Sequence, residues 1–191
     1  LLVHLAVQGR MQGFAEFDPV TARRRERWER AKARAAGDPD VPGTVGAVAL
    51  DGRGVLAAAT STGGRELKRP GRVGDSPVPG AGNYASAHAA VSATGWGEFM
   101  LREATAKSIA LRVEGGEPPQ LAAEGVLRTM ERRFGRPIGV ICLSAGGAFG
   151  VVHGTAAMPH AWRIEGEPSA HARFSCGAPT ALSGAPTSAE R

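Results

Sequence analysis

The sequence is poor in cysteine and in aromatic residues and has no long hydrophobic run, and each shortage excludes a class of protein. It has two cysteines, Cys142 and Cys176, and neither has the spacing of a metal-ligand motif. One pair of cysteines gives little support for a disulfide scaffold, so we expect a reducing, cytoplasmic setting. The apolar opening LLVHLAVQG carries no basic segment and is shorter than the about 20 residues that a membrane-spanning helix needs. We therefore expect a soluble protein with no membrane partner.

The overall composition is that of a globular domain. The 191 residues are 42% hydrophobic and 21% charged, which excludes a chain that is disordered throughout. The net charge is +5, and much of the excess lies in TARRRERWERAKARAAG at residues 21–37. A solvated helix face or linker explains this stretch better than a nucleic-acid site. Packing likewise explains Trp28, Trp96 and Trp162 better than a base-stacking platform, so we expect no nucleic-acid partner.

The first clear boundary in the chain lies directly before Thr44. Asp18 followed by Pro19 predicts a helix start, and the arginine-rich helix should run to about Gly37. The segment GDPDVPG at residues 37–43 then combines helix-breaking glycine and proline with turn-forming aspartate. We expect this segment to separate the basic helix from the domain that follows.

A β-hairpin is predicted immediately after this boundary. The runs TVGAVALD and VLAAATSTGG have strand character and are separated by the turn-forming GRG at Gly52–Gly54. If the loop is centred on Arg53, the residue numbers of each facing pair add up to twice 53, so that Thr44 faces Thr62. Directly opposed side chains have Cβ atoms about 4.5–5.5 Å apart. The register alone therefore predicts two threonine hydroxyls together at one end of the hairpin.

The rest of the chain alternates loops with regular elements. Residues 63–85, GGRELKRPGRVGDSPVPGAGNYA, are predicted to be a loop, and AAVSATGWGE a strand that ends in glycines. A helix is expected next over Glu98–Val113. A second helix should carry Leu121, Leu127, Met130 and Phe134 at mostly helical spacing and end at Gly135. A hairpin of IGVICLS and AFGVVHG around Gly146–Gly147 and a disordered tail from Ser175 should complete the chain.

Three threonines stand at predicted strand ends beside glycines. Thr44 and Thr62 face each other in the hairpin, and Thr94 is followed by Gly95. A lone threonine at a strand end usually just starts the strand, but three together predict a site built from hydroxyls and exposed backbone amides. His88 and His153 are better explained as ordinary polar residues than as metal ligands.

Several ordered segments carry a more specific signal: GTVGAVALD, ATSTGG, PGRVGDSP, GAGNYA, TGWGE and, near the end, GTAAMPHAW. From about Gly43 to Phe174 they resemble the β-subunit of the plant-type asparaginases and isoaspartyl peptidases, which are N-terminal-nucleophile (Ntn) hydrolases. Residues 44–174 would then be the catalytic β-subunit, residues 1–43 the end of the α-subunit with its linker, and residues 175–191 a disordered tail. The resemblance implies an α+β fold, a four-layer αββα sandwich that is incomplete here because the family's N-terminal α half is missing.

The resemblance also implies a self-cleaving threonine enzyme. The hydroxyl of Thr44 would attack the carbonyl of Gly43, and cleavage would leave Thr44 as a new N-terminus. A threonine hydroxyl is a weak nucleophile, but a free α-amine with a pKa of about 7.7–8.0 is a suitable base beside it. Thr62 would orient and activate Thr44, and the Thr94 hydroxyl and the Gly95 N–H would form the oxyanion hole.

Substrate recognition follows from the same resemblance. Arg72 would hold the α-carboxylate of an aspartyl substrate and Asp75 its α-ammonium, which are chemically matched pairs. Thr94, Gly95 and Gly97 would line the same pocket, and Trp96 would narrow it. The expected substrates are small molecules, L-asparagine and β-aspartyl (isoaspartyl) dipeptides.

The resemblance implies no organic cofactor and no metal at the catalytic site, since the family's sodium-binding loop would lie in the missing N-terminal half. The cleaved α- and β-subunits would form a heterodimer that pairs into a dimer in the full-length protein. The alternative is a catalytically inactive, truncated fragment that acts as a binding module or has no function. The third possibility is an enzyme of the glycosylasparaginase or threonine aspartase branch of the family. The motif PGRVGDSP together with STGG favours the plant-type branch over the glycosylasparaginase branch.

Overall fold

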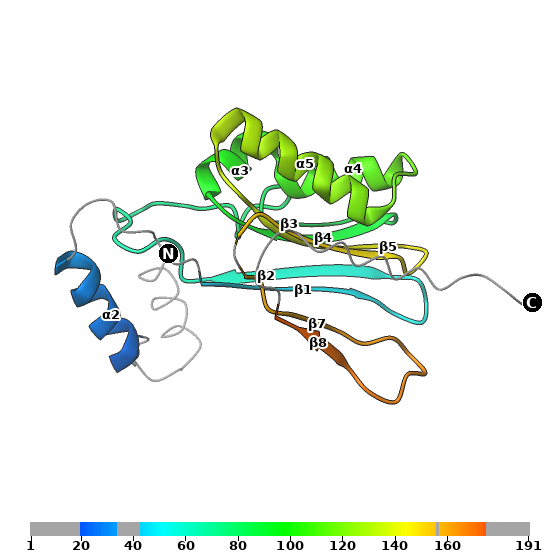
Figure 1. Ribbon diagram of the computed structural model, residues 1–191, viewed down its shortest axis with the longest axis horizontal. Helices are drawn as coiled ribbons and strands as arrows, with labels where there is room; N and C mark the ends of the chain where they lie inside the picture. The colour runs from blue at the N-terminus through cyan, green and yellow to red at the C-terminus, as the bar shows by residue number, and fades with distance from the viewer. Residues whose placement is uncertain (1–19, 34–42, 156, 175–191) are drawn as a thin grey trace, which may run out of the picture. The chain divides into compact units, whose positions relative to one another are not determined.

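The structure of the chain, a computed structural model, describes residues 20–33, 43–155 and 157–174. The chain divides into two compact units, each described by itself. The first unit comprises Leu1–Val41 and Gly64–Val73, and the second comprises Pro42–Gly63 and Gly74–Arg191. Figure 1 labels the helices and strands. All strands of the described residues belong to the second unit.

The first unit contains the predicted basic helix, α2 (Ala22–Ala33). The side chain of Thr21 accepts a hydrogen bond from the backbone N–H of Arg24 at 3.3 Å, which is the bond of a helix N-cap. The helix thus begins later than the sequence predicted, because a threonine hydroxyl satisfies the free N–H. The predicted cap at Asp18 and the predicted stop at Gly37 lie outside the described residues.

Both acidic residues of α2 form ion pairs within the helix, which keeps an excess of positive charge. Glu26 pairs with Arg30, and Glu29 with Lys32 at 3.0 Å, one helical turn apart. The Lys32 ammonium also lies 3.6 Å from the centre of the Trp28 ring. These side chains are largely exposed, as expected of a solvated helix face.

The second unit begins with the predicted hairpin, formed by β1 (Thr44–Leu50) and β2 (Leu56–Thr62). Its antiparallel register pairs Thr44 with Thr62 and Leu50 with Leu56, so the register predicted from the sequence is confirmed. The loop closes with a hydrogen bond from the Asp51 N–H to the Val55 carbonyl at 3.0 Å. Two strands alone are marginally stable, so this hairpin needs a surface to pack on.

That surface is a four-stranded antiparallel sheet in the order β3-β4-β5-β6. Its strands are β3 (Asn83–Ala85), β4 (Ala89–Thr94), β5 (Gly139–Ser144) and β6 (Phe149–His153). Strand β4 and the β5–β6 hairpin confirm the sequence prediction. Strand β3 was missed, because it is only three residues long and lies at the end of a loop rich in glycine and proline.

Three helices cover one face of this sheet, and the β1–β2 hairpin covers the other (Figure 1). Ala89, Val91 and Ala93 of β4 belong to the core formed with the helices, and all three are buried. Ser92 points to the opposite face, where its side chain would collide with any side chain at position 46 of β1. The described residues therefore form an α+β unit of helices, sheet and hairpin, in agreement with the predicted fold class.

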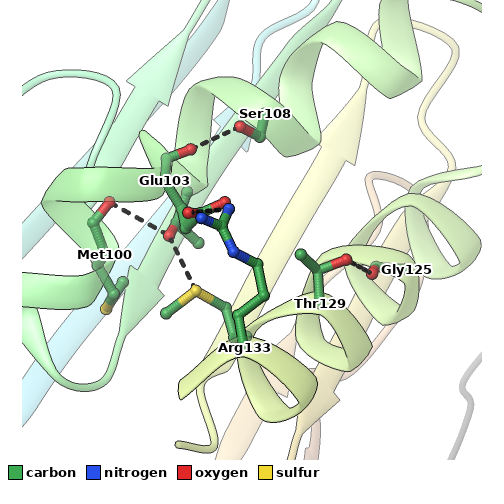
Figure 2. A network of polar contacts seen from close by, with 8 residues as sticks. Met100, Glu103, Ser108, Gly125, Thr129 and Arg133 are labelled. Carbon is green, nitrogen blue, oxygen red and sulfur yellow. Dashed lines mark hydrogen bonds and ion pairs between the residues drawn. The ribbon is translucent and has the colours of Figure 1, made fainter.

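The first helix predicted from the sequence is in fact two, α3 (Gly97–Glu103) and α4 (Thr105–Glu114). The break is at Ala104, whose backbone is left-handed with φ 45° and ψ 51°. The hydroxyl of Ser108 donates to the Glu103 carbonyl at 2.8 Å, as Figure 2 shows, and so satisfies a carbonyl left open by the break. Periodicity did not reveal the break, because the apolar pattern continues across it.

The other predicted helix is α5 (Pro119–Phe134), which ends at Gly135 in a left-handed cap with φ 61°. Leu127 and Met130 face the core as predicted. Leu121 does not, since 49% of it is exposed, and the helix instead buries its small residues against the sheet, Ala122 and Ala123 among them. No helix of the described residues is long and apolar enough to span a membrane.

Two further strands, β7 (His160–Trp162) and β8 (His171–Arg173), pair near the end of the described chain. Neither strand was predicted, because a strand of three residues is too short to show an alternating pattern. The Trp162 ring stacks on the ring of His171 across the pair, with centres 5.2 Å apart. Trp162 is thus a packing residue, as expected. The predicted disordered tail from Ser175 lies outside the described residues.

Candidate active site

The hairpin brings Thr44 and Thr62 together at its open end, beside Gly43. The Thr44 hydroxyl donates to Thr62 Oγ1 at 3.4 Å, and the Thr62 hydroxyl donates to the Gly43 carbonyl at 3.1 Å. Because a hydroxyl has one proton, the two bonds form a chain with a fixed direction. The Thr62 hydroxyl, which ends this chain, polarises the Gly43 carbonyl in the peptide bond between Gly43 and Thr44. The Thr62 hydroxyl therefore connects the Thr44 hydroxyl to the Gly43 carbonyl through two hydrogen bonds.

Strand β4 ends at the same end of the second unit at which β1 begins and β2 ends (Figure 1). The two layers touch at Thr60 and Ser92, whose hydroxyl oxygens are 2.6 Å apart. Two residues further along the two strands come Thr62 and Thr94. Side chains two residues apart on a strand share a face. Thr94 therefore lies on the side of β4 that faces the hairpin, and its approach to Thr44 stays a prediction from the sequence.

Gly95 follows Thr94 in a tightly packed position. A Cβ atom there would lie 3.0 Å from both Ile138 Cγ2 and Met100 Sδ. The backbone of Gly95 thus packs directly on the helix-covered core. Gly97, the third predicted glycine of the site, is the buried first residue of α3. Trp96 lies between them with the Arg136 guanidinium 3.9 Å from its ring centre.

Asp75 lies in the second unit and is only 7% exposed. Its carbonyl accepts hydrogen bonds from the N–H groups of Val78 at 2.9 Å and Gly82 at 3.1 Å, which fix its backbone. Arg72 belongs to the first unit, where its N–H donates to the Arg69 carbonyl at 3.1 Å. The two units are described separately, so the predicted partnership of Arg72 and Asp75 stays a prediction from the sequence.

Three residues of this region were missed by the sequence reasoning: Gly46, Thr60 and Ser92. The pattern ATST was the available signal, because Thr60 lies two residues before Thr62 and therefore on the same face. Ser92 was also visible as a polar residue within an otherwise apolar strand. A glycine inside a strand, such as Gly46, often marks a close approach of another chain segment.

Other reactive groups of the described residues do not compete with this site. Burial raises the pKa of the Cys142 thiol to about 12, and its hydrogen bond to Gly150 opposes this shift, so the thiol is neutral and unreactive at neutral pH. No group of three His, Cys, Asp or Glu side chains is arranged to hold a metal ion within the part of the chain that the structure describes. His153 is buried, with Nδ1 2.9 Å from the Thr155 carbonyl oxygen.

The sequence matches a known family over most of its length. The profile of the asparaginase family covers residues 7–171. The chain therefore belongs to the asparaginase family.

Individual relatives narrow the comparison to the plant-type branch. The chain is 39% identical over 181 residues to the plant-type L-asparaginase of Pyrococcus furiosus, an alignment that covers 84% of this chain and 59% of that protein. It is 42% identical over 153 residues to the isoaspartyl peptidase/L-asparaginase of Bos taurus, covering 78% and 50%. It is 46% identical over 127 residues to the isoaspartyl peptidase of Escherichia coli, covering 65% and 40%. The chain thus spans about half the length of these relatives.

Proposed function

We propose that this chain carries the catalytic part of a threonine hydrolase that cuts its own backbone between Gly43 and Thr44. The mature site would then hydrolyse the side-chain amide of L-asparagine or the isopeptide bond of β-aspartyl dipeptides. The relatives' names support this choice of substrates. The observation that carries the proposal is the hydrogen bond from Thr62 to the Gly43 carbonyl, directly beside the hydroxyl of Thr44.

The proposed self-cleavage is an acyl shift followed by hydrolysis. Thr44 Oγ1 attacks the Gly43 carbonyl carbon, and the Thr62 hydroxyl stabilises the negative charge that develops on the carbonyl oxygen. The C–N bond breaks, the acyl group moves to the oxygen as an ester, and the nitrogen takes up a proton. Water then hydrolyses the ester and releases the carboxylate of Gly43. The product is a free α-amine on Thr44.

That amine is the base the hydroxyl otherwise lacks. With a pKa of about 7.7–8.0 in its unperturbed form, it accepts the proton of the Thr44 hydroxyl near neutral pH. The hydroxyl attacks the substrate amide, ammonia or an amino acid leaves, and water hydrolyses the aspartyl ester on Thr44. The Thr94 hydroxyl and the Gly95 N–H are proposed to bind the developing oxyanion. A donor of this kind lowers the barrier by about 2.7–4 kcal/mol.

Recognition of a free aspartyl group is proposed for Arg72 and Asp75. The guanidinium of Arg72 matches the α-carboxylate, and the carboxylate of Asp75 matches the α-ammonium. Gly97 would line the same pocket without filling it. Holding both α-groups leaves the side-chain amide as the part of the substrate that reaches Thr44.

Release of ammonia from L-asparagine and of leucine from β-aspartyl-leucine tests this proposal. The parent chain and Thr44→Ser, which keeps a hydroxyl, should release product, and Thr44→Ala should not. Ser61→Ala is the matched control, because it removes an exposed hydroxyl from the outer face of the same hairpin. Equal rates in Thr44→Ser and Thr44→Ala, or a parent no faster than Thr44→Ala, would contradict the proposal.

The assembly of the mature protein is also a proposal. The two pieces made by cleavage would stay together as a heterodimer, and such heterodimers would pair, without an organic cofactor. The rival is an inactive fragment that only binds partners. The hydrogen-bonded Thr44 and Thr62 favour the enzyme over this rival.

A further inference from the structure

Gly82 joins the three parts of the second unit that carry predicted site residues. Its carbonyl accepts two hydrogen bonds, one from the hydroxyl of Thr60 in β2 at 3.0 Å and one from the N–H of Ala93 in β4 at 2.9 Å. Its own N–H donates to the Asp75 carbonyl at 3.1 Å. One residue thus connects the hairpin, the end of β4 and the loop of Asp75.

At this junction, the donor and the acceptor of each hydroxyl hydrogen bond can be assigned. The single proton of Thr60 is committed to the Gly82 carbonyl, so the 2.6 Å bond between Thr60 and Ser92 must be donated by Ser92. Ser92 is 3% exposed, so water does not replace this bond. The hydrogen bonds that run from Ser92 through Thr60 to Gly82 therefore lie partly buried between the layers, with Ser92 itself buried.

Two glycines set how closely the backbones approach. A Cβ atom at Gly82 would lie 2.7 Å from the carbonyl carbon and oxygen of Asp75 and from Ser76 Cα, which are backbone atoms that cannot rotate away. A Cβ atom at Gly46 would lie 2.2 Å from Ser92 Oγ and 3.0 Å from its Cβ. The spacing between hairpin, sheet and loop is thus fixed by atoms that have little freedom to move.

We propose that Thr60, Ser92 and Gly82 form a positioning unit. This unit fixes the relative positions of the β1–β2 hairpin that carries Thr44, the end of strand β4 that carries Thr94, and the loop that carries Asp75. The inference rests on the proposed function, because those three parts matter only if Thr44, Thr94 and Asp75 act together. The members of the unit act through their neighbours. Thr60 lies two residues before Thr62 on the same face, and the N–H that Gly82 accepts belongs to the residue before Thr94.

Thr60→Val tests the unit, because valine keeps the shape of threonine and removes the hydroxyl that makes two of its bonds. Thr129→Val is the matched control: the Thr129 hydroxyl also donates to a carbonyl at 3.0 Å in a partly buried place, but within α5 and away from the site (Figure 2). Thr60→Ser restores the hydroxyl, and Ser92→Ala removes one bond instead of two.

The first readout is the rate of cleavage between Gly43 and Thr44, followed by intact mass, with the melting temperature recorded for each variant. A misplacement of about 1 Å at reacting groups can slow a reaction about 100-fold. We expect Thr60→Val to slow cleavage at least about tenfold more than Thr129→Val does, Ser92→Ala to slow it less, and Thr60→Ser to restore it. A slowing equal to that of Thr129→Val would overturn the inference.

The second readout, amide hydrogen exchange, does not need an active enzyme. Loss of the two hydrogen bonds of the Thr60 hydroxyl should speed exchange in β1 and β2 at least about fivefold in Thr60→Val and leave β5 and β6 unchanged. If the parent chain is never cut but this local change appears, the proposed self-cleavage fails and the positioning unit stands. If the parent is cut and Thr60→Val matches Thr129→Val in both readouts, the positioning unit fails and the proposed function stands.

Discussion

The hairpin β1–β2 and the helix-covered sheet differ in how they are held. In the sheet, Val91 packs with Ile109 and Met130 of the helices, and all three are fully buried. In the hairpin, alternate residues point to the outer face, where 74% of Val45 is exposed, and hydroxyls make specific contacts on the inner face. Apolar burial therefore stabilises the scaffold, whereas directional polar contacts place the proposed nucleophile. Stability and proposed chemistry should respond to different mutations.

The largest expected loss of stability comes from the core of the scaffold. Ile109→Ala removes a fully buried side chain of α4 from this core and should lower the free energy of unfolding by about 2–5 kcal/mol. Val45→Ala on the hairpin's outer face should change it by less than about 0.5 kcal/mol. Urea unfolding of both variants measures the difference. Equal losses would contradict the division between scaffold and hairpin.

Tight packing between α5 and the sheet should give the next effect. A Cβ atom at Gly150 of β6 would lie 2.7 Å from the Gln120 nitrogen, so Gly150→Ala must push the start of α5 away. We expect a loss of about 1–3 kcal/mol. Gly146→Ala in the adjacent turn is the control, because its nearest neighbour would be 3.9 Å away. If thermal unfolding ranks the two variants equally, the packing explanation is wrong.

The break between α3 and α4 should allow a stabilising change. Ala104 has a left-handed backbone, which costs a residue with a side chain about 1–2 kcal/mol. Ala104→Gly should therefore raise the free energy of unfolding by up to about 1 kcal/mol, after the greater chain entropy of glycine is offset. Ala110→Gly, in the interior of α4, should instead lower it. The same sign in both variants would contradict the assigned strain.

The smallest expected effect lies in the turn of the hairpin. Hydrogen bonds from the N–H groups of Val55 and Arg53 lower the pKa of Asp51, and partial desolvation opposes this. A lowered pKa in the folded state adds stability above the unfolded-state pKa, and this contribution is lost as the pH falls through the folded-state value, that is below about pH 4. In Asp51→Asn, the urea midpoint of unfolding should fall less steeply than in the parent chain as the pH is lowered. An unchanged slope would contradict it.

The sequence predicted local features well. The register that pairs Thr44 with Thr62 follows from one short turn, so neighbouring residues contain the information needed. The α5 stop at Gly135 was predictable for the same reason. Family resemblance supplied the roles proposed for Arg72 and Asp75, which the residues alone would not have indicated.

Features that depend on tertiary contacts were missed. The helix break at Ala104 is supported by the Ser108 hydroxyl, which a periodic apolar pattern does not reveal. The contact of Thr60 with Ser92 joins residues 32 positions apart, and no local rule pairs them. Strand β3 exists because β4 lies beside it, not because of its own composition.

If self-cleavage turns Thr44 into an N-terminus, the intact mass of the chain after a day at neutral pH will reveal it. We expect the parent chain and Ser61→Ala to separate, under denaturing conditions, into one piece that ends at Gly43 and one that begins at Thr44. Together the pieces weigh one water more than the uncut chain. Thr44→Ala should stay whole, and Thr62→Val should be cut more slowly. A parent that stays whole, or a Thr44→Ala variant cut at the same bond, would contradict the account.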